Sequence, residues 1–180
     1  MRASMSAAPP TLPILITPHP ALRTKARPVL PGDADELQTL VPQMFETMYK
    51  APGIGLAAPQ VGIGLRVVVV DLMPDNQPVP MTLINPKIAA VSDEWATREE
   101  GCLSVPNQYA DVTRPSRITV RYHDLAGVQR QVEADGLLAA CLQHELDHLD
   151  GVLFVDHLSA LKRNILLRRL AKDMKLKAAD

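Results

Sequence analysis

The sequence predicts an α+β fold in which short, mostly antiparallel sheets pack around a central metal-binding helix, with an N-terminal helix and a C-terminal helix. Three observations lead to this prediction. Residues 34–50 have the apolar spacing of a helix, residues 118–134 alternate like a β-hairpin, and residues 136–149 form an apolar stretch with helical periodicity. Strand patterns fill the middle of the chain and helix patterns flank them, an order typical of α+β proteins.

The first half of the chain supplies one helix and two strands. Apolar side chains recur every three or four positions over residues 34–50, and Pro42 is expected to interrupt or bend this helix. Residues 66–72 form a β-branched run, which predicts a buried strand. Residues 81–91 contain a second strand pattern. We expect Asn85-Pro86 to break it, because proline cannot donate a hydrogen bond to a sheet.

The second half supplies a hairpin and a central helix. Residues 118–123 and 129–134 alternate polar and apolar side chains, and turn residues separate them, so the two segments are expected to pair. Asp135 is expected to cap a helix over residues 136–149, which Asp150-Gly151 should end.

Composition narrows the class of protein. The chain has 180 residues, 47% of them hydrophobic, which suits one domain with a proper core. We expect this domain to cover residues 13–180 and residues 1–12 to form a flexible tail without the apolar core of a secretory signal. The net charge of −1 argues against a general polyanion binder, and no apolar run approaches the ~20 residues of a membrane span. Two cysteines are too few for a disulfide framework, so a reducing compartment is expected.

The strongest functional signal is the H-E-x-x-H motif at residues 144–148, inside the central helix. Residues four apart lie on one face of a helix, about 6 Å apart along its axis, so His144 and His148 can bind one metal ion. Glu145 can then manage the protons of a water on that ion. The motif predicts metal-assisted hydrolysis. The alternative is a helix face that happens to hold two histidines.

A catalytic site of this kind needs three protein ligands and one open position, and two cysteines compete for the third place. Cys141 precedes His148 by seven residues, about 10.5 Å along the axis, which is too far for a short side chain. We therefore interpret Cys141 as a small apolar wall residue. Cys102 lies in an extended segment that folding could bring to the open side of the histidines. We favour Cys102 as the third ligand, with a buried structural cysteine as the alternative.

Three segments together resemble the motifs of peptide deformylases. Residues 53–60 (GIGLAAPQ) resemble G-x-G-x-A-A-x-Q, residues 100–104 (EGCLS) resemble E-G-C-x-S, and residues 144–148 (HELDH) match H-E-x-D-H. They occur in the family's order, and the resemblance runs from about Ile14 into the C-terminal helix. It implies a single catalytic deformylase domain over residues 13–180. Such an enzyme removes the N-terminal formyl group from formyl-methionine of newly synthesised polypeptides and releases formate.

The resemblance implies a metal site made of Cys102, His144 and His148, which holds one divalent ion. The family's ion is typically Fe(II) in cells, and Zn, Ni or Co can occupy the site; the ligand types alone do not select the ion. The implied mechanism is attack of a metal-activated water on the formyl carbonyl, with Glu145 as general acid and base. The Gln60 side-chain amide and the Leu103 backbone N–H would help to stabilise the resulting oxyanion.

The resemblance also implies where the substrate binds. Besides the flank of His144, we expect seven residues to contact it: Ile54, Gly55, Gly101, Tyr109, Leu137, Ala140 and Cys141. Those on the helix also fit plain core positions, because helical spacing alone cannot separate the two roles. Tyr109 departs from an arginine found in some bacterial members, and Arg98 stands where some have an apolar residue at the pocket rim. Asp147 is expected to be structural and paired with Arg114.

The C-terminal helix, which Ser159 is expected to cap, carries seven basic residues between Lys162 and Lys177. In related bacterial enzymes this helix docks on the ribosome, so the resemblance implies docking here. A solvated basic face is the alternative. We expect a monomer in the bacterial cytoplasm that acts on nascent formyl-methionyl polypeptides and binds no membrane.

Two other functions remain open from the sequence. An H-E-x-x-H metallopeptidase would cut internal peptide bonds, but its third ligand is usually His or Glu, so Cys102 argues against it. A non-enzymatic, ribosome-associated module with a structural metal would need neither Glu145 nor Gln60, and the presence of both argues against it.

Overall fold

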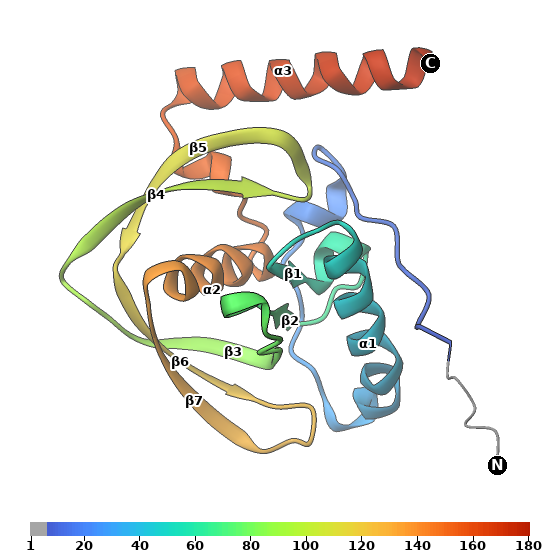
Figure 1. Cartoon of the computed structure of the whole chain (residues 1–180), viewed down its shortest axis with the longest axis vertical. Coiled ribbons are helices and arrows are strands. Elements are labelled where there is room, and N and C mark those ends of the chain that lie inside the picture. The colour runs from blue at the N-terminus through green and yellow to red at the C-terminus, as the bar shows by residue number, and fades with distance from the viewer. Residues whose placement is uncertain (1–6) are drawn as a thin grey trace.

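The computed structural model of the chain describes residues 7–180 (Figure 1). Part of the predicted flexible tail, residues 1–6, lies outside the described residues. Leu12, the last residue of that predicted tail, donates its backbone N–H to Thr47 Oγ1 at 2.9 Å. The helices and strands are α1 (Ala34–Lys50), β1 (Gly55–Ala57), β2 (Val67–Val70), β3 (Met81–Val91), β4 (Trp95–Cys102), β5 (Val105–Pro115), β6 (Arg117–His123), β7 (Gln129–Asp135), α2 (Gly136–Leu149) and α3 (Ala160–Ala179).

The strands of the described chain form two antiparallel sheets. One has five strands in the order β1-β2-β3-β6-β7, and the other is the β4–β5 hairpin. The β3–β6 ladder ends at Val91 and Ile118, and the β4–β5 ladder begins at Trp95 and Pro115. The hairpin therefore extends the β3–β6 pair beyond a bend, and it folds back over α2 (Figure 1).

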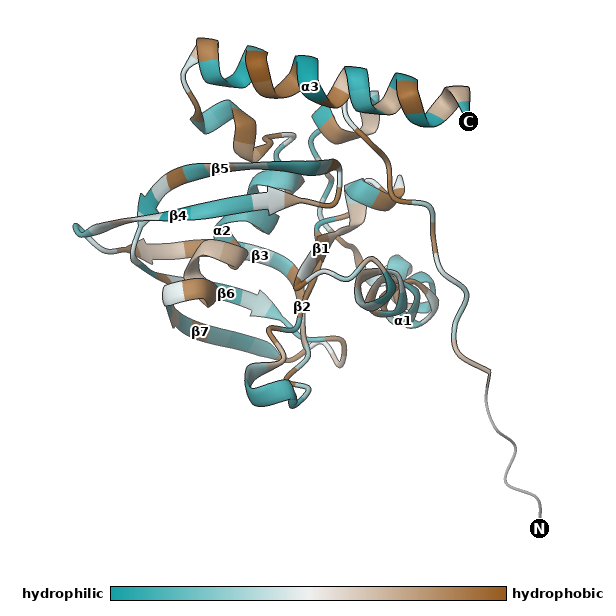
Figure 2. Ribbon diagram, turned by 45° about the horizontal axis from the view of Figure 1, so that its top comes forward, coloured by the Kyte–Doolittle hydropathy of each residue, from teal (hydrophilic) through white to brown (hydrophobic). Residues whose placement is uncertain are grey.

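Helix α2 lies between the two sheets (Figures 1 and 2). It contacts β1, β2, β6 and β7 of the larger sheet, and its Leu142 and Leu149 are fully buried there. A helix covered on both sides needs apolar residues on most of its faces, which explains the apolar stretch in the sequence. The predicted α+β fold with a central helix is confirmed.

Helix α3 packs with one face only. Leu166 and Leu170 are buried in a cluster with Val105 and Val112 of β5, and most of the remaining surface of α3 is exposed. Figure 2 shows the resulting alternation of hydrophilic and hydrophobic turns along this helix. Within residues 7–180, no helix combines the length and the hydropathy that crossing a membrane requires.

Local signals in the sequence place the helices correctly. The predicted helices over residues 34–50 and 136–149 form with these bounds. Gly151, just beyond α2, has a φ of +74°, the left-handed conformation that ends helices. The Ser159 hydroxyl accepts the backbone N–H of Lys162 at 3.3 Å and so caps α3 as predicted.

Three local expectations need correction. Pro42 does not interrupt α1, because the buried side chains around it, Val41 and Met44 among them, hold the helix against the core. Asn85 does not end β3. It adopts a φ of +50° at a bulge, and its amide exchanges two hydrogen bonds with the Val29 backbone, after which pairing resumes. Asp135 occupies the cap position of α2, but its side chain makes no cap hydrogen bond to the described residues.

Candidate metal centre

Three side chains that can each offer one metal-ligand atom meet beside α2. The ligand atoms of Cys102, His144 and His148 all lie within 4.8 Å of one another. The two imidazoles project from successive turns of α2, with their Nε2 atoms 3.2 Å apart. Cys102, at the end of β4, places its Sγ 3.3 Å from His148 Nε2. Cys141 is outside this group, and its Sγ lies 4.0 Å from the carbonyl oxygen of Ile54.

This donor set suits a divalent transition metal. One thiolate and two imidazoles supply three ligands and leave a fourth position open. Burial lowers the pKa of His148 well below its ordinary value, so its imidazole is neutral, the form that binds a metal. His148 Nδ1 and Glu145 Oε2 are buried without a hydrogen-bond partner among residues 7–180. Buried polar atoms are normally paired, so the unpaired Glu145 oxygen is consistent with a site that holds a further group. His148 Nδ1 is on the other side of the ring from Nε2, the atom that faces the ligand cluster.

A carboxylate behind the ligands orients His144. Glu100 Oε1 lies 3.0 Å from His144 Nδ1, which leaves Nε2 facing the ligand cluster. Arg114 donates to both oxygens of Glu100, at 2.7 and 3.0 Å, and to Asp147 at 2.9 Å, so the expected Arg114–Asp147 pair is confirmed. Burial alone would raise the pKa of Glu100, but the hydrogen bonds from His144 and Arg114 outweigh it and lower the pKa to about 2.

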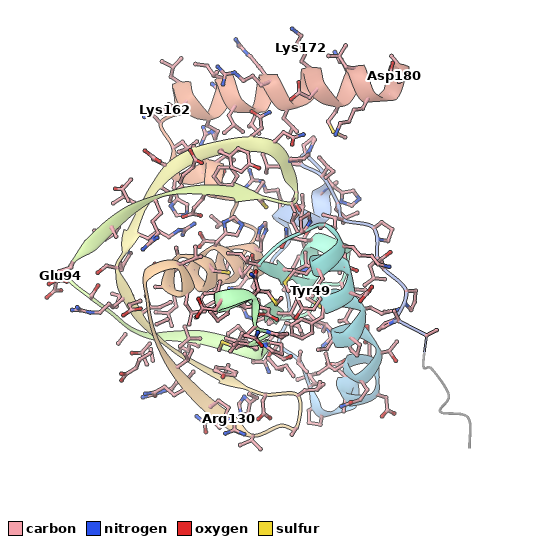
Figure 3. The ribbon with its side chains drawn as sticks, in the orientation of Figure 1. Tyr49, Glu94, Arg130, Lys162, Lys172 and Asp180 are labelled. Carbon is pink, nitrogen blue, oxygen red and sulfur yellow. The ribbon has the colours of Figure 1, made fainter. Side chains whose placement is uncertain are left out.

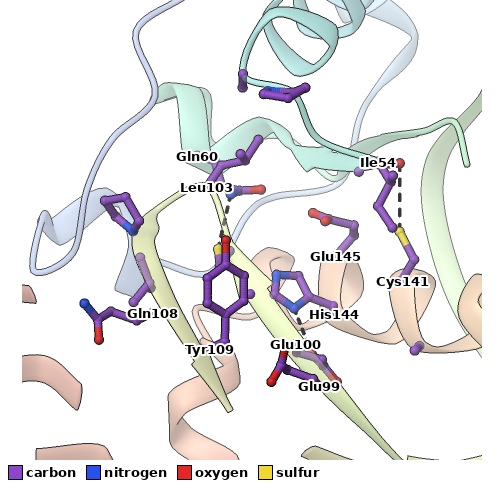
Figure 4. Close-up of a pocket in the computed structure, with 18 of the residues that line it drawn as sticks. Ile54, Gln60, Glu99, Glu100, Leu103, Gln108, Tyr109, Cys141, His144 and Glu145 are labelled. Atoms are coloured by element: carbon purple, nitrogen blue, oxygen red, sulfur yellow. Dashed lines mark hydrogen bonds and ion pairs between the residues drawn. The ribbon is translucent and has the colours of Figure 1, made fainter. Parts of the chain in front are cut away.

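Glu145 lies next to the ligand cluster and packs closely against Gly55. It is 5% exposed, and burial raises its pKa to about 7. A Cβ on Gly55 would lie 2.7 Å from Glu145 Oε1 and 2.9 Å from Cys141 Sγ, so only glycine leaves room for this packing. Figure 4 shows Glu145 and Cys141 rising from α2 toward the segment that carries Ile54.

Gln60 reaches the same place from the short 3₁₀ helix η3 (Ala58–Val61). Its side chain is 1% exposed and held at both ends. Gln60 Oε1 accepts the Ala57 backbone N–H at 2.9 Å, which turns Nε2 toward Ser104 Oγ at 3.1 Å and Cys102 Sγ at 3.6 Å. The amide donor therefore lies beside a metal-ligand atom in a fixed orientation.

Leu103 occupies the turn between β4 and β5, next to Cys102. It lines the cleft, and its side chain packs under Gly53, where an added Cβ would lie 2.8 Å from Leu103 Cδ1. The ligand segment and the glycine-rich segment, about fifty residues apart in sequence, are thus in direct contact.

A cleft of about 810 Å³ opens above these groups, and all seven residues expected to contact the substrate line it. Ile54 and Leu137 are partly exposed, and Tyr109 is 64% exposed at the mouth (Figure 4). Gly101 pairs with Tyr109 across the hairpin, and its missing side chain makes room for the Tyr109 ring, which would lie 2.5 Å from a Cβ at Gly101.

The structure adds residues to the site that the sequence did not single out. Ser104 is fully buried and accepts from Gln60, as described above. The Phe154 ring stacks on His144 with their centroids 6.1 Å apart. His157 Nε2 lies 2.8 Å from Asp147 Oδ2. Ser104 is the last residue of the EGCLS segment, so the motif itself could have identified it as a site residue. The other two follow α2 in a stretch with no motif.

Comparison with known proteins agrees with the geometry. A family model described as polypeptide deformylase matches residues 11–164. A peptide deformylase of Rhizobium meliloti (strain 1021) is 50% identical over 168 residues, covering 93% of this chain and 96% of the relative. One of Zymomonas mobilis subsp. mobilis is 51% identical over 171 residues, covering 92% and 96%.

Solved structures give the same match. The crystal structure of a peptide deformylase from Legionella pneumophila superposes with a TM-score of 0.88 at 45% identity, covering 94% of this chain and 99% of that chain. The peptide deformylase from Ehrlichia chaffeensis in complex with actinonin superposes with a TM-score of 0.86 at 38% identity, covering 91% and 98%.

Proposed function

Because this chain belongs to the polypeptide deformylase family, and is therefore a metal-dependent enzyme that removes the N-terminal formyl group from nascent polypeptides, we propose that Glu145 carries the protons of the reaction beside a metal held by Cys102, His144 and His148. The observation that carries the proposal is the buried Glu145 carboxylate, with one oxygen unpaired among the described residues, next to the ligand cluster.

The ion that we propose for cells is Fe(II), and Zn, Ni or Co can take its place. Cys102, His144 and His148 would hold it. When bound, a divalent ion supplies Lewis acidity, which activates water and polarises a carbonyl. The chain's own contribution is to fix the ligands, through Glu100 on His144 and Gln60 on Cys102.

Glu145 acts as general base and then as general acid. Its carboxylate takes a proton from the attacking water, and the same carboxyl group later delivers a proton to the leaving amine nitrogen, so that formate and a free N-terminus result. A pKa near 7 suits both steps, because the group then accepts and releases a proton at neutral pH.

Two donors stabilise the negative charge that develops on the formyl oxygen. One is the Gln60 Nε2 amide, whose direction is set by the Ala57 contact on its other end. The other is the backbone N–H of Leu103, in the turn that follows Cys102. Loss of one such donor typically raises the barrier by about 3 kcal/mol.

The apolar side of the cleft receives the methionine side chain. Ile54, Leu137, Ala140 and Cys141 line it, and an unbranched thioether adapts well to such a wall. Gly55 and Gly101 contact the substrate from the wall of the cleft, and Tyr109 at the mouth contacts the residues that follow methionine.

The remaining proposals concern the setting of the enzyme. We place it as a monomer in the bacterial cytoplasm, where nascent formyl-methionyl chains are made, and α3 docks it on the ribosome. Support for docking comes from the basic residues on the exposed part of α3. Figure 3 shows Lys162 and Lys172 on this helix, at the edge of the molecule.

The substrate class can be tested with three peptides. Metal-loaded protein should release formate from formyl-Met-Ala-Ser, and should leave acetyl-Met-Ala-Ser and an internally quenched peptide intact. Cleavage of the quenched peptide would favour the metallopeptidase instead. The absence of formate release from folded, metal-loaded protein would refute the proposal.

A further inference from the structure

Arg98 lies where the substrate cleft meets a second cavity. This second cavity has a volume of about 390 Å³, and the residues that line both cavities are Arg98, Glu100 and Ala140. The guanidinium lies against the start of α2, with Nη2 3.6 Å from the position that a Cβ on Gly136 would take. Leu137 and Ala140, one turn apart on that helix, line the same stretch of the cleft. The apolar wall of the cleft therefore ends at a cation.

The guanidinium of Arg98 has no partner among the described residues. Within residues 7–180 it takes part in no ion pair or hydrogen bond, whereas its neighbours Arg114 and Arg117 pair with Glu100 and Glu94. Of the three residues shared by the two cavities, Ala140 is apolar and Glu100 is engaged by Arg114 and His144. The N–H groups of Arg98 are thus the polar groups still available at this junction, and they are donors only.

The surrounding charges select the kind of acceptor. Among the described residues that line the substrate cleft, Glu99, Glu100 and Glu145 carry carboxylates and Arg98 is the one arginine. Arg114 and Arg117 line only the second cavity and pair with Glu100 and Glu94. An anionic side chain in the cleft would have to approach its three carboxylates. A neutral acceptor would gain the hydrogen bonds of Arg98 without that repulsion. The junction therefore favours an uncharged oxygen at the tip of an unbranched side chain.

We infer that Arg98 is a specificity-determining residue that lets the first-residue pocket accept formylated methionine sulfoxide as well as formyl-methionine. This inference rests on the proposed function, because it assumes that the first side chain lies along Leu137 and Ala140. A thioether sulfur is a weak acceptor, whereas the sulfoxide has nearly the same length and carries a strong acceptor oxygen. A wholly apolar pocket would leave that oxygen unpaired and reject it. The reaction itself leaves the sulfoxide unchanged, since only the formyl C–N bond is hydrolysed.

The test compares kcat/KM for formyl-Met(O)-Ala-Ser with kcat/KM for formyl-Met-Ala-Ser, using Ni(II)-loaded full-length protein. The sulfoxide value should lie within about tenfold of the methionine value. Arg98→Met should lower the ratio of sulfoxide to methionine by about tenfold, which corresponds to one unpaired acceptor. Arg98→Lys, which keeps a donor, should retain most of the ratio. Arg117→Met is the matched control, since Arg117 borders only the second cavity and pairs with Glu94.

A ratio in Arg98→Met that stays within twofold of the parent ratio would overturn the inference, and so would a parent enzyme that prefers methionine by more than a hundredfold. A third peptide, formyl-Met-Asp-Ser, separates a different role. If Arg98→Met weakens only this substrate, Arg98 recognises the second residue and the inference is wrong. These failures leave turnover of formyl-Met-Ala-Ser intact, whereas failure of the proposed function would abolish it for every peptide.

Discussion

Gly55 is a position in the cleft where an added atom would press on Glu145. We predict that Gly55→Ala lowers kcat/KM by roughly 10²-fold, because a Cβ there would lie 2.7 Å from Glu145 Oε1 and displace the carboxylate. The contact is with the movable end of a side chain, so the variant should still fold. Steady-state kinetics on a formyl-methionyl peptide measures the effect.

Gly64→Ala is the matched control for this change. A Cβ at Gly64 meets no atom within 4 Å, so its kinetics should equal those of the parent. Parent-like activity of Gly55→Ala would show that Glu145 does not need the position seen in the structure.

Glu100 is the residue through which the protein holds His144 in its metal-binding orientation. We predict that Glu100→Gln weakens metal affinity by about 10- to 100-fold. The amide lacks the negative charge and has one acceptor oxygen in place of two, so it cannot keep all three hydrogen bonds from His144 and Arg114. Competition with a chelator, followed by metal analysis, measures the affinity. Glu99→Gln, at the exposed neighbouring position, should retain the parent affinity. Equal affinities in all three proteins would remove Glu100 from the metal site.

For single residues, the sequence identifies those whose chemistry depends on local spacing. His144 and His148 are four apart on one helix, and the Glu145 between them follows from the same pattern. Phe154, which stacks on His144, could not be assigned, because it follows α2 in a stretch with no motif. Ser104 belongs to the EGCLS motif, but its contact with Gln60 joins segments that are 44 residues apart.

Among the elements, the connection between β2 and β3 depends on one buried carboxylate. Asp71 accepts the backbone N–H groups of Met73 and Val79 at 2.9 and 3.0 Å, and it also accepts the hydroxyl of Tyr49. Burial alone would raise the pKa of Asp71, but these hydrogen bonds outweigh it and lower the pKa.

The pH dependence of stability follows from the sign of that shift. The unfolded chain binds the proton more tightly than the folded chain, so Asp71 contributes full stability above the unfolded pKa of about 3.9 and loses it as the pH falls further. We predict that Asp71→Asn is less stable than the parent at pH 7 and that the difference narrows below about pH 4. Urea unfolding of both proteins across this range measures it. A difference that stays constant or widens in acid would contradict the assignment.

The elements also show where prediction from sequence fails. Helices α1 and α2 have clear periodicity and are predicted with the correct bounds. Strands β4 and β5 are missed, because most of the residues of β4 are exposed and show no alternation of polar and apolar residues. The hairpin is fixed by its position as a continuation of the β3–β6 pair and by its contact with α2 through Arg114, Glu100 and Asp147.

For the whole molecule, α3 offers a surface that the catalytic site does not use. Its distal half has the basic residues Lys172, Lys175 and Lys177 exposed, while its proximal half is anchored by Leu166 and Leu170. If α3 docks on the ribosome, changing these three lysines to glutamine should weaken co-sedimentation with ribosomes and steepen its loss with salt. Turnover of a free peptide should stay within twofold.

A double variant, Lys50→Gln with Lys87→Gln, removes positive charge from other elements and serves as the control. Its co-sedimentation should equal that of the parent. If the α3 variant also sediments like the parent, the basic face of α3 is only solvated and the docking proposal is wrong.

The two sheets, α2 and the β4–β5 hairpin together bring three sequence motifs to one point. The glycine-rich segment packs against Leu103, the EGCLS segment supplies Cys102, and α2 supplies the histidines. The kind of chemistry that each motif can carry could be predicted from the sequence. That the three motifs lie close together depends on how the β4–β5 hairpin folds over α2, and no local sequence pattern encodes that fold.

The measurement that tests the central claim most directly is kcat for formate release by Glu145→Gln, with the metal content determined on the same sample. The amide has nearly the same size and cannot take a proton from water. We predict that metal content equals that of the parent while kcat falls by at least 10²-fold. Parent-like kcat in metal-loaded Glu145→Gln would contradict the claim that Glu145 carries the protons of the reaction.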